Sequence, residues 1–134
     1  MSNSGASAGQ RFSATEARKA EWRLAMRWRR RAEAALSDAG LTLSQWIVLD
    51  ALSELIAETE DAVSQNEVCE RVELDRATMS AVMCRLEKKQ LVSRGIDLTG
   101  RAWRIFLTPR AEVLLLRCAI PMECASSRAS DALE

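Results

Sequence analysis

The chain has 134 residues, and its 19 Lys and Arg side chains are balanced by 19 Asp and Glu, so the formal net charge at pH 7 is zero. This length suits one domain with a real core and is too short for two. No apolar run approaches the length needed to cross a bilayer, and the start of the chain does not resemble a secretory signal. We therefore expect a single-domain cytoplasmic protein with no membrane partner.

The residue types that the sequence lacks limit the catalytic and metal-binding chemistry that it could support. The sequence contains no His and no Tyr, so the commonest general base is absent. It also lacks a phosphate-binding glycine loop and a nucleophile elbow, and we expect no enzyme. The four cysteines (Cys69, Cys84, Cys118 and Cys124) include no C-x-x-C pair. This spacing argues against a zinc site, and we expect neither a metal nor a cofactor.

The N-terminal part is predicted to be a tail followed by a long helix. Residues 1–14 are small and polar, which is typical of a mobile tail. A helix from about Ser13 to Asp38 has an inward apolar stripe that includes Trp28 and Ala32. Its basic run, from Arg27 to Arg31, could touch DNA or a membrane surface. We favour a solvated face with some side chains reaching a ligand pocket. A second helix, Leu43 to about Ala57, is apolar almost all round and is expected in the middle of the body.

The next segment has the pattern of a helix-turn-helix. Ser64 and Glu67 fit a capping box, and Asp75 is a good N-cap for the following helix. In that second helix Met79, Val82 and Leu86 form the inward stripe. The face left outside carries Arg76, Thr78, Ser80, Ala81, Cys84, Arg85 and Lys88. Two helices joined by so short a turn place the second one where it can read a DNA groove.

A hairpin and a last helix follow. Strands are predicted for Leu91–Ile96 and Arg101–Leu107, with a tight turn at residues 97–100 between them. Arg94 and Arg101 leave the turn region basic, which suits a narrow minor groove or its phosphates. Thr108 and Pro109 begin a helix with a strongly apolar run, which is either plain core or a dimer contact. Pro121 is expected to kink or end this helix.

Charge is unevenly distributed along the chain. From Asp50 to Asp75 there are nine acids and one base, whereas Arg76 to Arg110 has eight bases and only two acids. Binding follows the local field more than the total charge, so a neutral protein can carry a basic DNA-binding edge.

In this order and spacing, several short motifs resemble the MarR family of winged helix-turn-helix transcriptional regulators. They are Leu41 to Trp46, Leu74 to Ser80, Arg85 to Val92, and Gly100 to Arg104, closed by Leu107-Thr108. The resemblance runs from about Arg23 to Leu116. This chain departs from the family where Glu73 stands at a turn position that is often glycine.

The resemblance implies a fold and an assembly. We expect a mainly α protein with a small β-hairpin wing, organised as an N-terminal dimerisation helix (15–40), a winged helix-turn-helix domain (41–108) and a C-terminal dimerisation helix (109–134). A homodimer is implied that binds a pseudo-palindromic operator, usually as a repressor, and leaves DNA when a small molecule or an oxidant acts on it. The dimer contacts expected are Trp22, Leu114, Leu115 and Ile120.

Specific residues are predicted for each role. The DNA contacts are Ser64, Gln65, Arg76, Thr78, Ser80, Ala81, Arg85, Lys88, Arg94 and Arg101. An aromatic carboxylate is the expected effector, with Arg27, Trp28, Arg31, Trp46 and Trp103 as its ligands, although tryptophans are more often core residues. Cys84 and Cys118 are the candidates for a redox switch, although a free cysteine is more often a small buried hydrophobe.

Two alternatives remain open. The domain could be a winged-helix module for protein contacts whose DNA face is idle, as the zero net charge allows. It could also be a thiol-based redox-sensing repressor that binds DNA but ignores small molecules.

Overall fold

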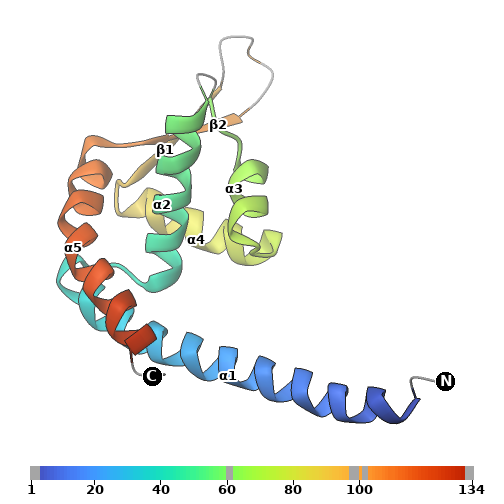
Figure 1. Cartoon of the computed structure of the whole chain (residues 1–134). Helices are drawn as coiled ribbons and strands as arrows, with labels where there is room; N and C mark the ends of the chain where they lie inside the picture. The colour runs from blue at the N-terminus through green and yellow to red at the C-terminus, as the bar shows by residue number, and fades with distance from the viewer. Residues whose placement is uncertain (1–3, 60–61, 97–99, 101–102, 132–134) are drawn as a thin grey trace.

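The computed structural model describes residues 4–59, 62–96, 100 and 103–131, and the side chains of residues 13–127 within these ranges. The protein is mostly helical with one antiparallel hairpin, as predicted (Figure 1). Its elements in chain order are α1 (Ser4–Leu36), the 3-10 turn η1 (Ser37–Ala39), α2 (Leu43–Glu58), α3 (Gln65–Val72), α4 (Arg76–Lys88), β1 (Val92–Ile96), β2 (Trp103–Leu107) and α5 (Pro109–Asp131).

Helix α1 is longer than the sequence pattern indicated. It begins at Ser4, so the residues predicted as a tail are helical from Ser4 on. This segment lacks an apolar stripe, which is why it resembled a tail, but Ala6 and Ala8 favour a helix without needing a packing partner. In Figure 1 the N-terminal half of α1 extends away from the rest of the molecule, whereas its C-terminal end lies against α5.

Helix α2 occupies the centre, as predicted. Thr42 and Gln45 form a capping box that fixes its first turn. Val48, Leu49 and Leu52 are fully buried because the other elements surround this helix. The largest other buried side chains come from α1, α3, α4 and the segments beside the hairpin: Leu36, Val63, Val68, Met79, Met83, Leu86 and Leu91.

The hairpin is held on both sides. Strand β1 pairs antiparallel with β2, with Val92 opposite Leu107 and Ile96 opposite Trp103. On the other edge of β2, the Ile105 amide donates to the Val63 carbonyl at 2.8 Å. The predicted turn falls on residues 97–99 and Gly100; residues 97–99 lie outside the described part of the chain, and Gly100 has a φ of +72°.

Helix α5 starts as predicted and continues past Pro121. The Thr108 hydroxyl accepts a hydrogen bond from the Ala111 amide at 3.2 Å, and Pro109 is the first helical residue. Pro121 lies inside α5, which continues to Asp131, so of the two predicted effects of this proline, a kink or an end, the end does not occur. Cys118 and Met122, on either side of the proline, are both buried in the core.

Candidate nucleic-acid interface

The start of each helix in the helix-turn-helix is fixed by a side-chain cap. The Ser64 hydroxyl accepts from the Glu67 amide and the Glu67 carboxylate accepts from the Ser64 amide, both at 3.2 Å. Asp75 accepts from the amide and from the hydroxyl of Thr78, both at 2.8 Å. The Thr78 amide and hydroxyl hold the pKa of the Asp75 carboxyl below its ordinary value. Both predicted caps are therefore confirmed.

Helix α4 presents the face that the sequence pattern predicted. Met79, Val82, Met83 and Leu86 are buried against the core. All seven residues expected on the outer face are exposed: Arg76, Thr78, Ser80, Ala81, Cys84, Arg85 and Lys88. Gln65, at the start of α3, donates its side-chain amide to the Ser80 hydroxyl at 3.4 Å, so the start of α3 lies beside this face.

The wing is tied to α4 by an ion pair that the sequence did not reveal. The Arg94 Nε of β1 lies 2.7 Å from the Glu87 Oε1 of α4. Arg94, predicted to contact DNA, is thus held against the helix by a carboxylate. Arg101, predicted to enter the minor groove, lies outside the described residues.

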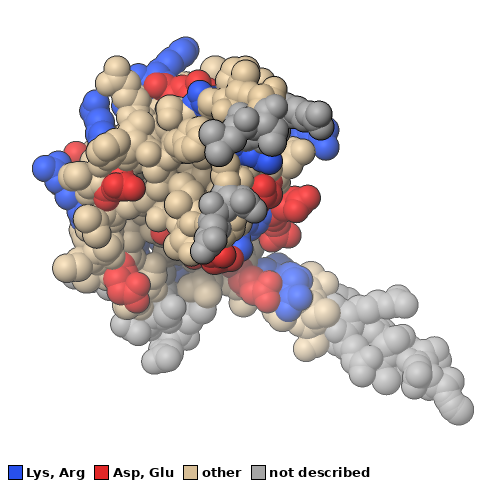
Figure 2. Space-filling model, turned by 90° about the horizontal axis from the view of Figure 1, so that it is seen from above, with Lys and Arg blue, Asp and Glu red and all other residues tan. Residues whose placement is uncertain are grey.

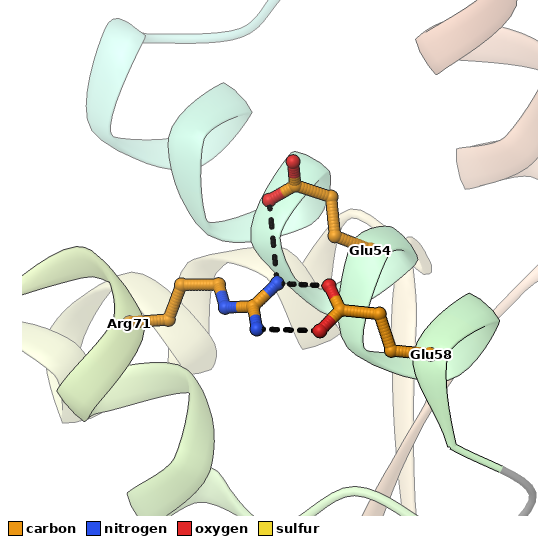
Figure 3. Close-up of polar contacts among 3 residues, drawn as sticks. All are labelled: Glu54, Glu58 and Arg71. Atoms are coloured by element: carbon orange, nitrogen blue, oxygen red, sulfur yellow. Dashed lines mark hydrogen bonds and ion pairs between the residues drawn. The ribbon is translucent and has the colours of Figure 1, made fainter.

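Helix α3 is fixed to α2 by a second cluster of charges (Figure 3). Arg71 donates through both terminal nitrogens to the Glu58 carboxylate, one of them at 2.8 Å, and Glu54 lies 3.8 Å away. The hydrogen bond to Glu58 raises the pKa of Arg71, and the same bond lowers the pKa of Glu58. Arg71, the one basic residue in the acidic stretch, is therefore engaged in an intramolecular ion pair, which fixes the position of α3 beside α4.

Lys89 makes a third connection that sequence reasoning missed. Its ammonium group donates to the Gly40 carbonyl and to the Gln45 side chain, both at 2.6 Å. These contacts join the end of α4 to the start of α2. Lys88 and Arg110 line a cavity of about 330 Å³ beside this junction.

The charges on the surface are mixed. Seen from the wing end (Figure 2), Lys and Arg side chains project at the edges of the molecule, and acidic side chains are spread between them. On the face seen in this view, the basic side chains therefore do not form one continuous patch.

The predicted effector residues are only partly brought together. Arg27, Trp28 and Arg31 lie on α1, where it packs with α5. The Trp28 indole donates to the Ser126 hydroxyl at 3.0 Å, and Arg31 lines a cavity of about 380 Å³ with Pro121 and Cys124 of α5. Arg27 is partly buried, and its Nη1 atom is buried without a hydrogen-bond partner.

The two other tryptophans lie elsewhere. Trp46 is half-buried against the core, so it follows the more common role of tryptophan. Trp103 is the first residue of β2 and is exposed on the wing, at the opposite end of the molecule from α1 (Figure 1). Because the wing is so far from α1, Trp103 does not join the α1 residues in one pocket.

The two redox candidates differ in environment. All four cysteines are free thiols. Cys84 is exposed on α4, whereas Cys118 is buried in α5, where burial raises the pKa of its thiol. A raised pKa disfavours the thiolate, which is the form that reacts with oxidants. Within the described residues, no group of three or more His, Cys, Asp or Glu side chains could hold a metal ion.

The predicted dimer residues fall into two sets. Trp22 on α1 and Ile120 on α5 are exposed, whereas Leu114 and Leu115 are partly buried against the core of their own chain. Val113 and Leu116, which were not among the predicted dimer contacts, are also exposed, and at i, i+3, i+7 spacing they form a single stripe with Ile120.

The fold and these surfaces define a winged helix-turn-helix protein. The model that describes the MarR family matches residues 39–102, from the turn after α1 into the wing. The resemblance to the MarR family is therefore confirmed over these residues. No curated protein matches the chain in sequence.

Solved structures agree on the fold. BpsR of Bordetella bronchiseptica, whose DNA binding is regulated by 6-hydroxynicotinic acid, is 23% identical, with 85% of this chain and 83% of that chain covered and a TM-score of 0.73. A MarR-family regulator from a Rhodococcus species is 21% identical, with 90% and 84% covered and a TM-score of 0.74. A MarR-family protein of Mycobacterium tuberculosis, solved with p-aminosalicylic acid, is 25% identical, with 87% and 85% covered and a TM-score of 0.66.

Within the described ranges, no single helix is long and apolar enough to cross a membrane; only the pair Ser13–Ala39 and Leu43–Glu58, bent by 79°, has the length and composition when taken together.

Proposed function

We propose that the chain is a transcriptional regulator that binds a pseudo-palindromic DNA operator as a homodimer and is released by a small effector. The observation that carries this proposal is the exposed outer face of α4, which is polar and basic and lies beside the wing. A helix presented in this way fits the major groove, and a hairpin next to it reaches the adjacent minor groove.

The residues divide into two kinds of contact. Ser64 and Gln65, at the start of α3, are placed to meet phosphates, together with Arg85 and Lys88 of α4. Base edges would be read by Arg76, Thr78, Ser80 and Ala81, and Arg101 would enter the minor groove. In a symmetric dimer the two α4 helices would lie about 34 Å apart, one turn of DNA, or a multiple of that.

An aromatic carboxylate is the effector that fits the α1–α5 region best. The buried Nη1 of Arg27 has no partner, and a carboxylate would satisfy it. The indole of Trp28 and the cavity beside Arg31 lie near it on the same helix. Aromatic acids also appear with the structural neighbours from Bordetella and Mycobacterium. Binding between α1 and α5 would change the spacing of the two α4 helices and so release DNA, as in a repressor.

The test is DNA binding measured by fluorescence anisotropy at several salt concentrations, with a duplex selected from a random-sequence library. We expect selective binding that weakens steeply with salt, because phosphate contacts release counterions. Arg76→Ala should cost about 1–3 kcal/mol of binding free energy and relax sequence preference. Arg18→Ala, which removes the same charge from exposed α1, is the matched control and should bind as the wild type does.

Binding that is weak, unselective and insensitive to salt would instead favour a protein-interaction module. A thiol-sensing repressor is the second candidate, because Cys84 is exposed on the face of α4. Mass spectrometry of the oxidised protein would then find an adduct at Cys84, and loss of DNA binding on oxidation would disappear in Cys84→Ser.

A further inference from the structure

The wing has one face that is turned toward α4. Side chains alternate between the two faces of a hairpin, so Val92, Arg94 and Ile96 share one face with their partners Leu107, Ile105 and Trp103. Val92 and Ile105 are buried, and Arg94 reaches Glu87 of α4. This face therefore covers the body and α4 over its first two residue pairs.

The third pair extends past the body. Ile96 is 56% exposed and Trp103, directly opposite, is 64% exposed. Single exposed apolar residues are common on protein surfaces, but here two large ones form a cross-strand pair. The base of the hairpin is held in place, because β2 is hydrogen-bonded to Val63 and β1 is ion-paired to α4.

The opposite face of the wing is different. Phe106, which pairs with Ser93 and is 43% exposed, is diagonal to Gly95, and a Cβ added at Gly95 would come within 3.2 Å of the Phe106 ring. The Phe106 ring thus has an intramolecular partner, whereas the outer parts of Ile96 and Trp103 face solvent.

We propose that Ile96 and Trp103 form an apolar contact with the walls of the DNA minor groove, next to the major groove that receives α4. This inference rests on the proposed function, which it extends from charged contacts to an uncharged one. DNA is the occupant that fits, because the pair lies on the same hairpin face as Arg94, which is ion-paired to Glu87 of α4, the proposed reading helix. Apolar side chains are a known means of contacting the minor groove.

An uncharged contact has a signature that separates it from phosphate binding. It adds affinity at every salt concentration but releases no counterions, so it leaves the slope of log K against log salt unchanged. A phosphate contact such as that of Lys88 changes both. Trp103 is also a suitable position to test, because its side chain is exposed and replacing it should not unfold the protein.

The experiment compares variants in the anisotropy titration of the selected duplex at several salt concentrations. We expect Trp103→Ala to weaken binding about tenfold with an unchanged slope, and Trp103→Phe to recover most of the loss. Ile96→Ala should act in the same direction. Phe106→Ala, on the opposite face of the same hairpin, is the matched control and should stay within about twofold. Thermal unfolding of each variant shows that the fold is kept.

Two results would overturn the contact while leaving the proposed function intact. One is wild-type affinity in both Trp103→Ala and Ile96→Ala, which would mean that the pair does not contact DNA and is available to a protein partner. The other is a fall in slope in Trp103→Ala equal to that of Lys88→Ala. If the wild type itself shows no selective, salt-dependent binding, the proposed function fails, and this contact fails with it.

Discussion

Among the described residues, two residues other than glycine have left-handed backbone conformations, one at the end of α3 and one just after α4. Glu73, which ends α3, has a φ of +57°, and Gln90, just after α4, has a φ of +63°. A side chain in this region costs energy, because Cβ approaches the following carbonyl oxygen. Glu73 is therefore a strained residue in the short turn that sets the angle between α3 and α4.

Replacing Glu73 by glycine should relieve this strain. Glycine accepts the conformation freely but loses more entropy on folding, so we expect a net gain of about 0.5–1 kcal/mol in the free energy of unfolding. Urea unfolding measures this gain. Glu73→Ala is the control, because it removes the same charge but keeps a Cβ. An equal gain in both variants would show that the charge, and not the backbone, is responsible.

The cap of α4 should make stability depend on pH. The pKa of Asp75 lies below its ordinary value of 3.8 in the folded protein, because the Thr78 amide and hydroxyl donate to the carboxylate. The stabilisation is therefore complete above the unfolded pKa and is lost as the pH falls through the folded pKa.

Asp75→Asn should remove this part of the pH dependence. Asparagine caps a helix as well as aspartate, so the two proteins should have similar melting temperatures at pH 7. On acidification to about pH 3 the wild type should lose more stability than the variant. Thermal unfolding at several pH values measures the difference. Glu58 titrates with the same sign but is present in both proteins, so parallel pH profiles would mean that Asp75 contributes nothing.

At the scale of the elements, the features that the sequence predicted correctly are those formed by residues close together in the chain. The capping box at Ser64, the cap at Asp75 and the inward stripe of α4 each depend on residues a few positions apart, and all three are present. The ion pair between Glu87 and Arg94 was not predictable, because its geometry depends on how β1 packs against α4. The same holds for Lys89, whose partners lie more than forty positions earlier in the chain.

The Glu87–Arg94 ion pair determines whether the Arg94 guanidinium is available to a DNA phosphate. Glu87→Gln removes a carboxylate from beside the interface and leaves Arg94 able to turn to a phosphate. We expect several-fold tighter DNA binding and a salt slope steeper by about 0.9. The double variant Glu87→Gln with Arg94→Ala should lose the additional slope. A slope unchanged by Glu87→Gln would show that Arg94 stays away from the backbone.

At the scale of the whole molecule, α1 and α5 pack together at the end opposite the wing (Figure 1). The sequence suggested that both helices belong to a dimer interface, but it assigned Leu114 and Leu115 to the partner, and these pack against their own core. A run of adjacent leucines in a helix covers several faces, so periodicity alone could not separate the inner residues from the outer ones.

The exposed stripe on α5 is the best place to test the dimer. Leu116 is 78% exposed and Ile120 is 77% exposed, and Val113 extends the same face. Leu116→Glu would place an unpaired charge in an apolar interface, and we expect the dissociation constant of the dimer to rise about 100-fold or more. The monomer should keep its helices, because Leu116 contributes little to its own core. Analytical ultracentrifugation measures the first effect and circular dichroism the second.

The matched control for this variant is Ile96→Glu, which adds the same charge at an exposed apolar residue of the wing and should leave the dimer intact. Loss of the dimer should also weaken operator binding, because each half-site would then be bound independently and not through a linked pair. A Leu116→Glu protein that sediments as a dimer would mean that α5 is not the interface. The α1 surface around Trp22 would then be the next position to test, since it is the other large exposed apolar residue in this part of the structure.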